Sequence, residues 1–153
     1  MDVRYESVSK SFAGTPALLP LTLDVPDGTF LALLGPSGCG KTTALRLLAG
    51  LETPSTGRIF IGERNVTHMP PRGRDVAMVF QSYALYPHLS VFDNIAYPLR
   101  VRKIDKADRA KQVQKVAELL GLDQLLDRRP RQLSGGQRQR VALARAKIGR
   151  AHV

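Results

Sequence analysis

The sequence lacks the residues that usually stabilise secreted or membrane-embedded folds. It has one cysteine, Cys39, in 153 residues, so no disulfide can form within the chain, and zinc ribbons and disulfide scaffolds are excluded. Its apolar runs are strand-sized, well below the ~20 residues of a membrane-spanning helix. The first residues lack the basic-then-apolar order of a signal peptide. We therefore expect a cytosolic chain, whose 43% hydrophobic residues suffice to build a core.

Acidic residues are also few, and none follows Asp127. Residues 1–99 carry equal numbers of basic and acidic side chains, so the whole net charge of +10 lies in residues 100–153. A basic half can indicate nucleic acid or an anionic membrane surface as a partner. This half has little aromatic content on which bases could stack. We favour the simpler interpretation that an acidic partner surface lies elsewhere.

Hydrophobic patterns predict several strands. Alternating apolar and polar residues at 3–8 and 21–25 predict two half-buried strands. The runs at 30–34 and 76–80 are continuously apolar, which predicts two strands buried on both faces. A shorter strand is predicted at residues 58–61. We expect the buried strands to belong to the central sheet of an α/β fold.

Three helices are predicted from their boundary signals. The first spans residues 43–49 and ends at Gly50, a residue suited to the position after a helix. The second is capped by Asp105, keeps apolar residues at helical spacing, and ends at Gly121. The third begins near Ser134.

Residues 35–42 read Gly-x-x-x-x-Gly-Lys-Thr, the spacing of a phosphate-binding loop. Glycines let the backbone curl so that successive N–H groups point at a triphosphate, and the next helix adds its positive end. Lys41 can reach the phosphates, and Thr42 can offer a hydroxyl to Mg²⁺. The predicted binding residues of this loop are Gly35, Pro36, Ser37, Gly38, Cys39, Gly40, Lys41, Thr42 and Thr43.

A second pattern, Leu-Ser-Gly-Gly-Gln, occupies residues 133–137. Downstream of a phosphate-binding loop, it resembles the signature motif of ATP-binding-cassette (ABC) ATPases. A serine and two glycines at the start of a helix present a hydroxyl and unpaired backbone N–H groups to an anion. The resemblance implies that these residues bind the γ-phosphate of a nucleotide held by a second subunit. The implied binding residues are Ser134, Gly135, Gly136 and Gln137.

Residues 78–91 resemble ATPases of bacterial carbohydrate importers of the maltose and glycerol-phosphate type. On this resemblance, Gln81 reaches Mg²⁺ and the attacking water, and the residues after it form the groove for permease subunits. Phe12 resembles the aromatic residue that stacks on adenine. Tyr5 is the competing candidate, and its alternating strand context favours a core role instead.

The resemblance thus implies ATP and Mg²⁺ as cofactors. Its implied catalytic residues are Lys41, Gln81 and Ser134. Its implied metal-binding residues are Thr42 and Gln81.

The resemblance also implies the fold and the function. The fold is α/β: a P-loop NTPase (RecA-like) core with an N-terminal antiparallel β-subdomain and an inserted helical subdomain over about residues 83–140. Residues 1–146 correspond to a partial ABC ATPase domain. The implied function is that of an ATP-binding and ATP-hydrolysing subunit that energises solute import, of a sugar or related compound. Such a subunit is peripheral to the cytoplasmic face of a bacterial or archaeal plasma membrane, bound to permease subunits and a second ATPase subunit.

The elements that follow the signature in the family, an apolar strand ending in Asp-Glu and a switch histidine, have no match in the sequence. Without these carboxylates the Mg²⁺ site loses a ligand and water is not polarised. We expect the chain as given to bind nucleotide weakly and to hydrolyse none.

Residues 147–153 depart from the family pattern. One back-translation of these seven residues resembles the start of a common short-read sequencing adaptor. We therefore expect them to be a non-native tail, and the natural protein, including the rest of the core, to continue after about Ala146.

Two other functions remain open. A non-transport ABC ATPase acting on nucleic acid or ribosomes would suit the basic half, although residues 83–91 resemble importers. A catalytically dead nucleotide-binding fragment would suit the missing acidic pair.

Overall fold

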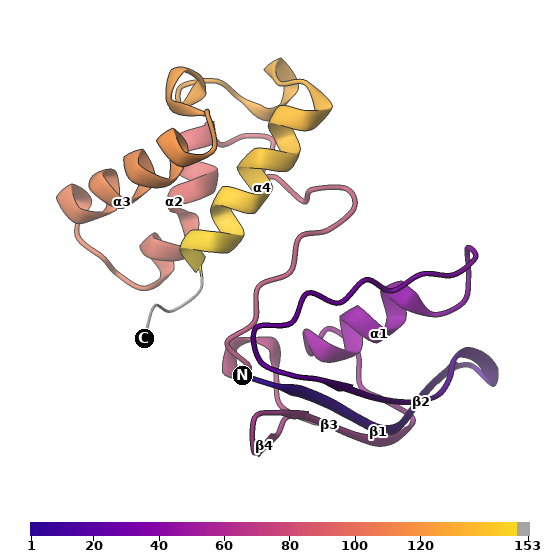
Figure 1. The fold of residues 1–153 in the computed structure, drawn as a ribbon. Helices are drawn as coiled ribbons and strands as arrows, with labels where there is room; N and C mark the ends of the chain where they lie inside the picture. Colours follow the sequence, from indigo (N-terminus) through magenta and orange to yellow (C-terminus); the bar gives the residue numbers. More distant parts are fainter. Residues whose placement is uncertain (150–153) are drawn as a thin grey trace. The chain divides into compact units, whose positions relative to one another are not determined.

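The computed structural model describes residues 1–149. The chain divides into two compact units, the first ending at Val76 and the second beginning at Ala77. The first unit contains a sheet and one α-helix, and the second contains three α-helices, with two short 3-10 turns between the last two (Figure 1). Within residues 1–149, no helix has the length and hydropathy needed to cross a membrane.

A four-stranded antiparallel sheet is the framework of the first unit, with strand order β2-β1-β3-β4. Between β1 and β2, Ala13 and Gly14 have φ angles of 47° and 84°, the positive values that a two-residue hairpin turn favours. The predicted strands at 3–8, 21–25 and 58–61 are confirmed, each within a longer strand. The strands are β1 (Val3–Phe12), β2 (Thr15–Val25), β3 (Thr56–Ile61) and β4 (Arg64–Asn65).

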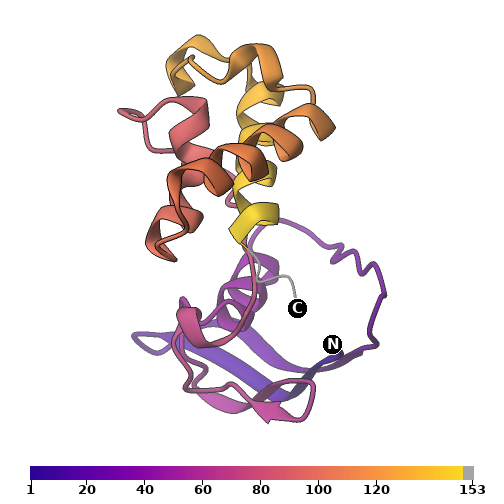
Figure 2. The same ribbon diagram turned by 90° about the vertical axis from the view of Figure 1, so that its left-hand side faces the viewer.

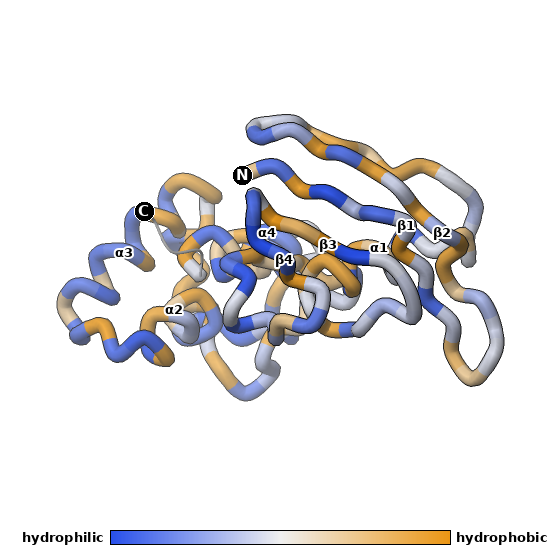
Figure 3. The backbone as a smooth tube through the Cα atoms, turned by 90° about the horizontal axis from the view of Figure 1, so that it is seen from below, coloured by the Kyte–Doolittle hydropathy of each residue, from blue (hydrophilic) through white to orange (hydrophobic). Residues whose placement is uncertain are grey.

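Helix α1 (Lys41–Leu48) packs on one face of this sheet (Figure 2). Hydrophobic and hydrophilic residues are interspersed along β1, as the tube in Figure 3 shows. Tyr5 and Val8 of β1 share one buried core with Leu47 of α1. Tyr5 is 4% exposed, and its hydroxyl donates to the carbonyl oxygen of Ala44 at 3.1 Å. Burial raises the pKa of Tyr5 to about 12. The predicted core role of Tyr5 is confirmed. The buried residues of this core are Tyr5, Val8, Leu47, Ile59, Ile61 and Val66.

The two predictions of strands buried on both faces are wrong. Residues 30–34 form no strand, and Phe30 and Leu34 are 94% and 90% exposed. Residues 76–80 form no strand either. A central strand is stable only when neighbouring strands bond its N–H and C=O groups. Neither run is paired with any of the four strands of the sheet in residues 1–149, so both remain irregular segments. In Figure 2 the chain between the end of β2 and the start of α1 is drawn as a plain coil.

Three helices form the second unit around one core, namely α2 (Val91–Val101), α3 (Lys106–Leu119) and α4 (Gly135–Gly149). The Asp105 side chain accepts from the N–H of Ala107 at 2.8 Å, and Gly121 has a φ of 61° after the end of α3. The predicted start and end of this helix are confirmed. The core includes Val91, Ile95, Leu99, Val113, Ala117, Leu122, Val141, Ala144 and Ile148.

The predicted non-native tail begins inside α4. Residues 147–149 continue this helix, and Ile148 is 5% exposed in the helical core. Residues 150–153 lie outside the described residues. The origin of the tail stays a prediction.

The last turn of α1 is held by the guanidinium group of Arg74, which is 2% exposed. It donates to the carbonyl oxygens of Leu47 at 2.7 Å and Leu48 at 3.0 Å. It also donates to the carbonyls of Met69 at 2.7 Å and Thr67 at 3.3 Å. A cation at this end of a helix also complements the helix dipole. Arg74 therefore joins α1 to the chain that follows the sheet.

We predict that Arg74→Met destabilises the first unit, because it removes four hydrogen bonds to buried and part-buried carbonyl groups. The expected cost is about 3 kcal/mol. Residue-resolved amide exchange of Val8 and Ile59 should then accelerate on the order of 100-fold. Arg72→Met is the matched control, since Arg72 is exposed in the same turn. Equal exchange rates in the two variants would show that Arg74 is not a stabilising contact.

Candidate functional site

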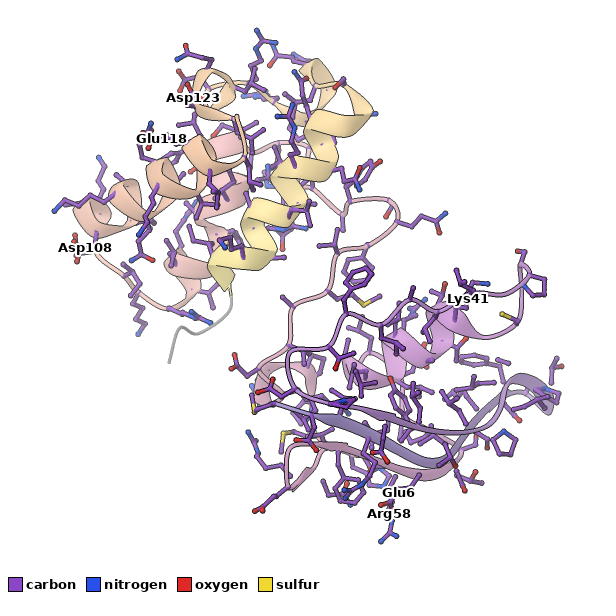
Figure 4. The ribbon with its side chains drawn as sticks, viewed as in Figure 1. Glu6, Lys41, Arg58, Asp108, Glu118 and Asp123 are labelled. Carbon is purple, nitrogen blue, oxygen red and sulfur yellow. The ribbon has the colours of Figure 1, made fainter. Side chains whose placement is uncertain are left out.

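The loop of residues 35–40 closes around the side chain of Lys41, the first residue of α1. The Lys41 ammonium donates to the carbonyl oxygens of Gly35 and Pro36, each at 2.7 Å. It also lies 3.3 Å from the sulfur of Cys39. Figure 4 shows Lys41 at the start of α1, beside this loop. The structure thus brings together the predicted loop and its lysine.

Helix α1 begins without a side-chain cap. Gly40 occupies the N-cap position, and the first turn contains no acidic residue. The N–H groups of Lys41, Thr42 and Thr43 therefore have no acceptor within the helix. Thr42 is exposed, so its hydroxyl is accessible beside these donors. Unpaired donors and the positive end of a helix suit an anion such as phosphate.

The loop lies directly against strand β2. A Cβ atom at Gly40 would lie 2.8 Å from the carbonyl oxygen of Ala17 and 2.8 Å from Cδ1 of Leu18. Gly40 also has a φ of 94°, which L side chains rarely adopt. Only glycine satisfies both conditions, so the contact with β2 fixes where α1 begins.

A groove of about 560 Å³ lies between the loop and β2. This volume is in the range of small-molecule sites. Its lining is mostly apolar on the β2 side, where Leu19 is 72% exposed. The lining residues are Pro16, Ala17, Leu18, Leu19, Pro20, Leu21, Gly38 and Cys39.

Phe12 ends β1 at the hairpin turn and is 46% exposed. Its neighbour Ser11 pairs with Pro16, which lines the groove. The Lys10 ammonium lies 4.8 Å from the centre of the Phe12 ring. Phe12 is therefore an exposed ring one residue along β1 from the partner of a groove residue, whereas Tyr5 is buried.

The second unit holds the other predicted site residues. Gln81 is exposed in a turn that the N–H of Tyr83 closes by donating to the carbonyl oxygen of Phe80 at 2.8 Å. Gln81 and the loop around Lys41 belong to different units. Their joint action stays a prediction.

The signature residues form a reciprocal cap at the start of α4. The N–H of Gln137 donates to Ser134 Oγ at 3.2 Å, and the N–H of Ser134 donates to Gln137 Oε1 at 2.8 Å. Apart from the chain neighbours and the backbone of α4 itself, no described atom lies within 4 Å of a Cβ built at Gly135 or Gly136. Packing within residues 1–149 therefore does not require these glycines, which leaves the backbone of the first turn open to a partner.

Residues 1–149 contain no group of three or more His, Cys, Asp and Glu side chains that could hold a metal ion. Mg²⁺ keeps several waters and binds through substrate phosphates with few protein ligands. The exposed hydroxyl of Thr42 beside the phosphate-type loop fits a metal that arrives with a nucleotide.

Comparison with known proteins places these features in context. The family profile described as ABC transporter matches residues 18–153. The trehalose/maltose import ATP-binding protein MalK of Thermococcus litoralis is 55% identical over 99% of this chain. The sn-glycerol-3-phosphate import ATP-binding protein UgpC of Bordetella avium is 52% identical over 93% of it. The chain spans 42% and 40%, respectively, of the length of these relatives.

A solved structure shares the fold. The dimeric, post-hydrolysis structure of the ATP-binding cassette MJ0796, bound to ADP and Pi, matches with a TM-score of 0.86 and 30% identity. The match covers 96% of this chain and 69% of that chain. The predicted α/β fold of a cassette with a β-subdomain and helices is confirmed.

We predict that Gly40→Ala weakens ATP binding by about tenfold or more, because the new Cβ displaces the loop from β2. A titration with a fluorescent ATP analogue measures this change. Gly28→Ala is the control: Gly28 also has a positive φ, 72°, but apart from its chain neighbours no atom of residues 1–149 lies within 4 Å of its Cβ position. That variant should lose about 1 kcal/mol of stability and keep its ATP affinity. Unchanged ATP affinity in Gly40→Ala would mean that the contact with β2 does not determine the position of the loop.

Proposed function

The chain belongs to the ABC transporter family, and we propose that it is part of an ATP-binding and ATP-hydrolysing subunit that energises solute import. The observation that carries the proposal is the loop closed around the Lys41 ammonium at the uncapped start of α1. The names of the two relatives, importers of trehalose/maltose and of glycerol phosphate, support a sugar or related solute.

In this proposal, Lys41 and the loop N–H groups hold the phosphates of ATP. The ammonium already lies over the loop, so it needs only to exchange the carbonyls of Gly35 and Pro36 for phosphate oxygens. Phosphate oxygens carry more negative charge and are stronger acceptors for an ammonium. Phe12 stacks on the adenine, and the groove along β2 receives the nucleoside.

Thr42 and Gln81 would hold the Mg²⁺ ion, through a hydroxyl and an amide oxygen. When bound, Mg²⁺ neutralises negative charge on the phosphates. Gln81 also orients the attacking water. The chain has no acidic residue after Asp127, so we assign hydrolysis to the complete subunit and ATP binding to this part of it.

Two partners follow from the proposal. The open first turn of α4, with Ser134 and the two glycines, binds the γ-phosphate of ATP on a second ATPase subunit. In the same proposal, the residues after Gln81 contact permease subunits, and the assembly lies on the cytoplasmic face of the membrane. The dimeric cassette MJ0796 supports the first partner, and the import proteins among the relatives support the second. A nucleic-acid function has no comparable support.

We predict that Phe12→Leu raises the dissociation constant for ATP by about tenfold, since stacking on a base contributes about 1–3 kcal/mol. Affinity for inorganic triphosphate should not change, because that ligand has no base. Phe12→Trp should retain ATP affinity. Phe60→Leu is the control, since the Phe60 ring also contacts a cation, Arg4 at 4.6 Å, but lies on β3. An equal loss of ATP and triphosphate affinity in Phe12→Leu would contradict stacking.

We predict that Lys41→Met abolishes ATP-driven solute uptake by the complete subunit assembled with its permease in membrane vesicles. Uptake should fall by about 100-fold or more, because the phosphates lose their main cationic partner. Arg46→Met removes a cation from the same helix, outside the loop, and should leave uptake intact. No uptake by the wild-type assembly, together with salt-dependent binding of nucleic acid, would instead favour a non-transport ATPase.

A further inference from the structure

The turn that carries Gln81 is followed by strained backbone. Tyr83 and Ala84 have φ angles of 62° and 46°, so two successive non-glycine residues lie in the left-handed region. Such conformations cost free energy and persist only where surrounding contacts hold them. The turn directly after Gln81 therefore needs contacts from elsewhere in the helical unit.

One of these contacts comes from Arg145 on α4. Its guanidinium donates to the carbonyl oxygen of Tyr83 at 3.1 Å and lies 5.4 Å from the centre of the Tyr86 ring. The Tyr86 ring in turn lies 4.7 Å from the ring of Tyr97 on α2. Arg145 is half-buried. One cation thus contacts this segment at a strained carbonyl and at an aromatic face.

A second contact holds the far end of the segment. Asn94 on α2 is fully buried, and its side chain accepts from the N–H of Tyr86 at 2.8 Å. It donates to the carbonyl oxygens of Tyr86, Leu89 and Ser90. Residues 86–90 are therefore fixed by α2 whether or not Arg145 is present. The carbonyl of Tyr83, nearer to Gln81, is held by α4.

Helix α4 also carries the signature residues in its cap and first turn. Ser134 caps it, and Arg145 lies about three turns further along the same helix. Rigid secondary-structure elements packed in a core are among the structures that carry coupling between sites. A displacement of its first turn is therefore transmitted to Arg145 and to the carbonyl of Tyr83.

We propose that Arg145 is a positioning residue, which fixes the turn of Gln81 to α4 so that Gln81 and the signature residues move together. Binding of a γ-phosphate at Ser134 then also sets the position of Gln81. The contact itself is independent of the proposed function, whereas its effect on hydrolysis rests on that function.

The first experiment measures the contact in this chain without nucleotide. Residue-resolved amide exchange is compared for the wild type and Arg145→Met. The Tyr83 N–H, which closes the Gln81 turn, should exchange at least about tenfold faster in the variant. The Tyr86 N–H, held by Asn94, should change less than about twofold and reports that the helical unit remains folded.

Arg140→Met is the matched control. Arg140 lies on the same helix and also donates to a backbone carbonyl, that of Leu120 at 2.9 Å. Its replacement should leave exchange at Tyr83 unchanged. Arg145→Lys keeps the charge but loses the planar fork, so its exchange rate at Tyr83 should lie between those of the wild type and Arg145→Met. Unchanged exchange at Tyr83 in Arg145→Met would overturn the proposal.

The second experiment uses the complete subunit with its permease and compares ATP hydrolysis with and without transported solute. Arg145→Met should lower the stimulation by solute at least about fivefold and leave the ATP dissociation constant unchanged, a split that simple destabilisation would not produce. If Arg145→Met speeds amide exchange at Tyr83 but leaves the stimulation of ATP hydrolysis by solute unchanged, the positioning role of Arg145 is overturned. A wild-type subunit that hydrolyses no ATP would overturn the proposed function alone, because exchange at Tyr83 is measured without nucleotide.

Discussion

The geometry of the phosphate-type loop depends on the contact between Gly40 and strand β2. A glycine with a φ of 94° lets the loop backbone approach the carbonyl of Ala17 where any larger residue would collide. Helix α1 starts at this contact, and its last turn is held by Arg74. The loop therefore derives its position from the antiparallel sheet and the helix that packs on it. In residues 1–149 this contact forms independently of the apolar segment that precedes the loop, since that segment forms no strand.

That independence explains which parts of the fold could be predicted from the sequence. The cap at Asp105, the end of a helix at Gly121 and the alternation around Tyr5 are local signals, and each was confirmed. The apolar runs at 30–34 and 76–80 indicated which residues favour burial. These runs carried no information on which strands would hydrogen-bond to them. Whether a strand forms depends on hydrogen bonds to neighbouring strands.

In the candidate site, too, local features could be predicted from the sequence and long-range contacts could not. The loop and the capped glycine pair follow from short motifs whose residues contact one another locally. The roles of Arg74 and Arg145 were not predicted, because the contacts by which they join helices to other segments span long stretches of sequence. These are 27 residues from Arg74 to Leu47 and 62 from Arg145 to Tyr83. A single long side chain among helical or loop residues leaves no periodic pattern. For Arg145, the available signal was its place on a helix between the apolar positions 144 and 148. Arginines at such places are common on helix surfaces, so this signal did not predict a contact with Tyr83.

The positive charge of the second unit has a related origin. Several of its arginines donate to backbone carbonyls: Arg138 to Leu133, Arg140 to Leu120 and Arg145 to Tyr83. A carbonyl oxygen accepts a hydrogen bond from a guanidinium group and leaves its positive charge in place, whereas a carboxylate would neutralise that charge. A unit whose arginines hold backbone turns therefore remains basic even when each arginine has a structural partner. These three arginines contribute to the net charge of +10 while holding turns and helix ends. The net charge by itself therefore does not indicate a nucleic-acid partner.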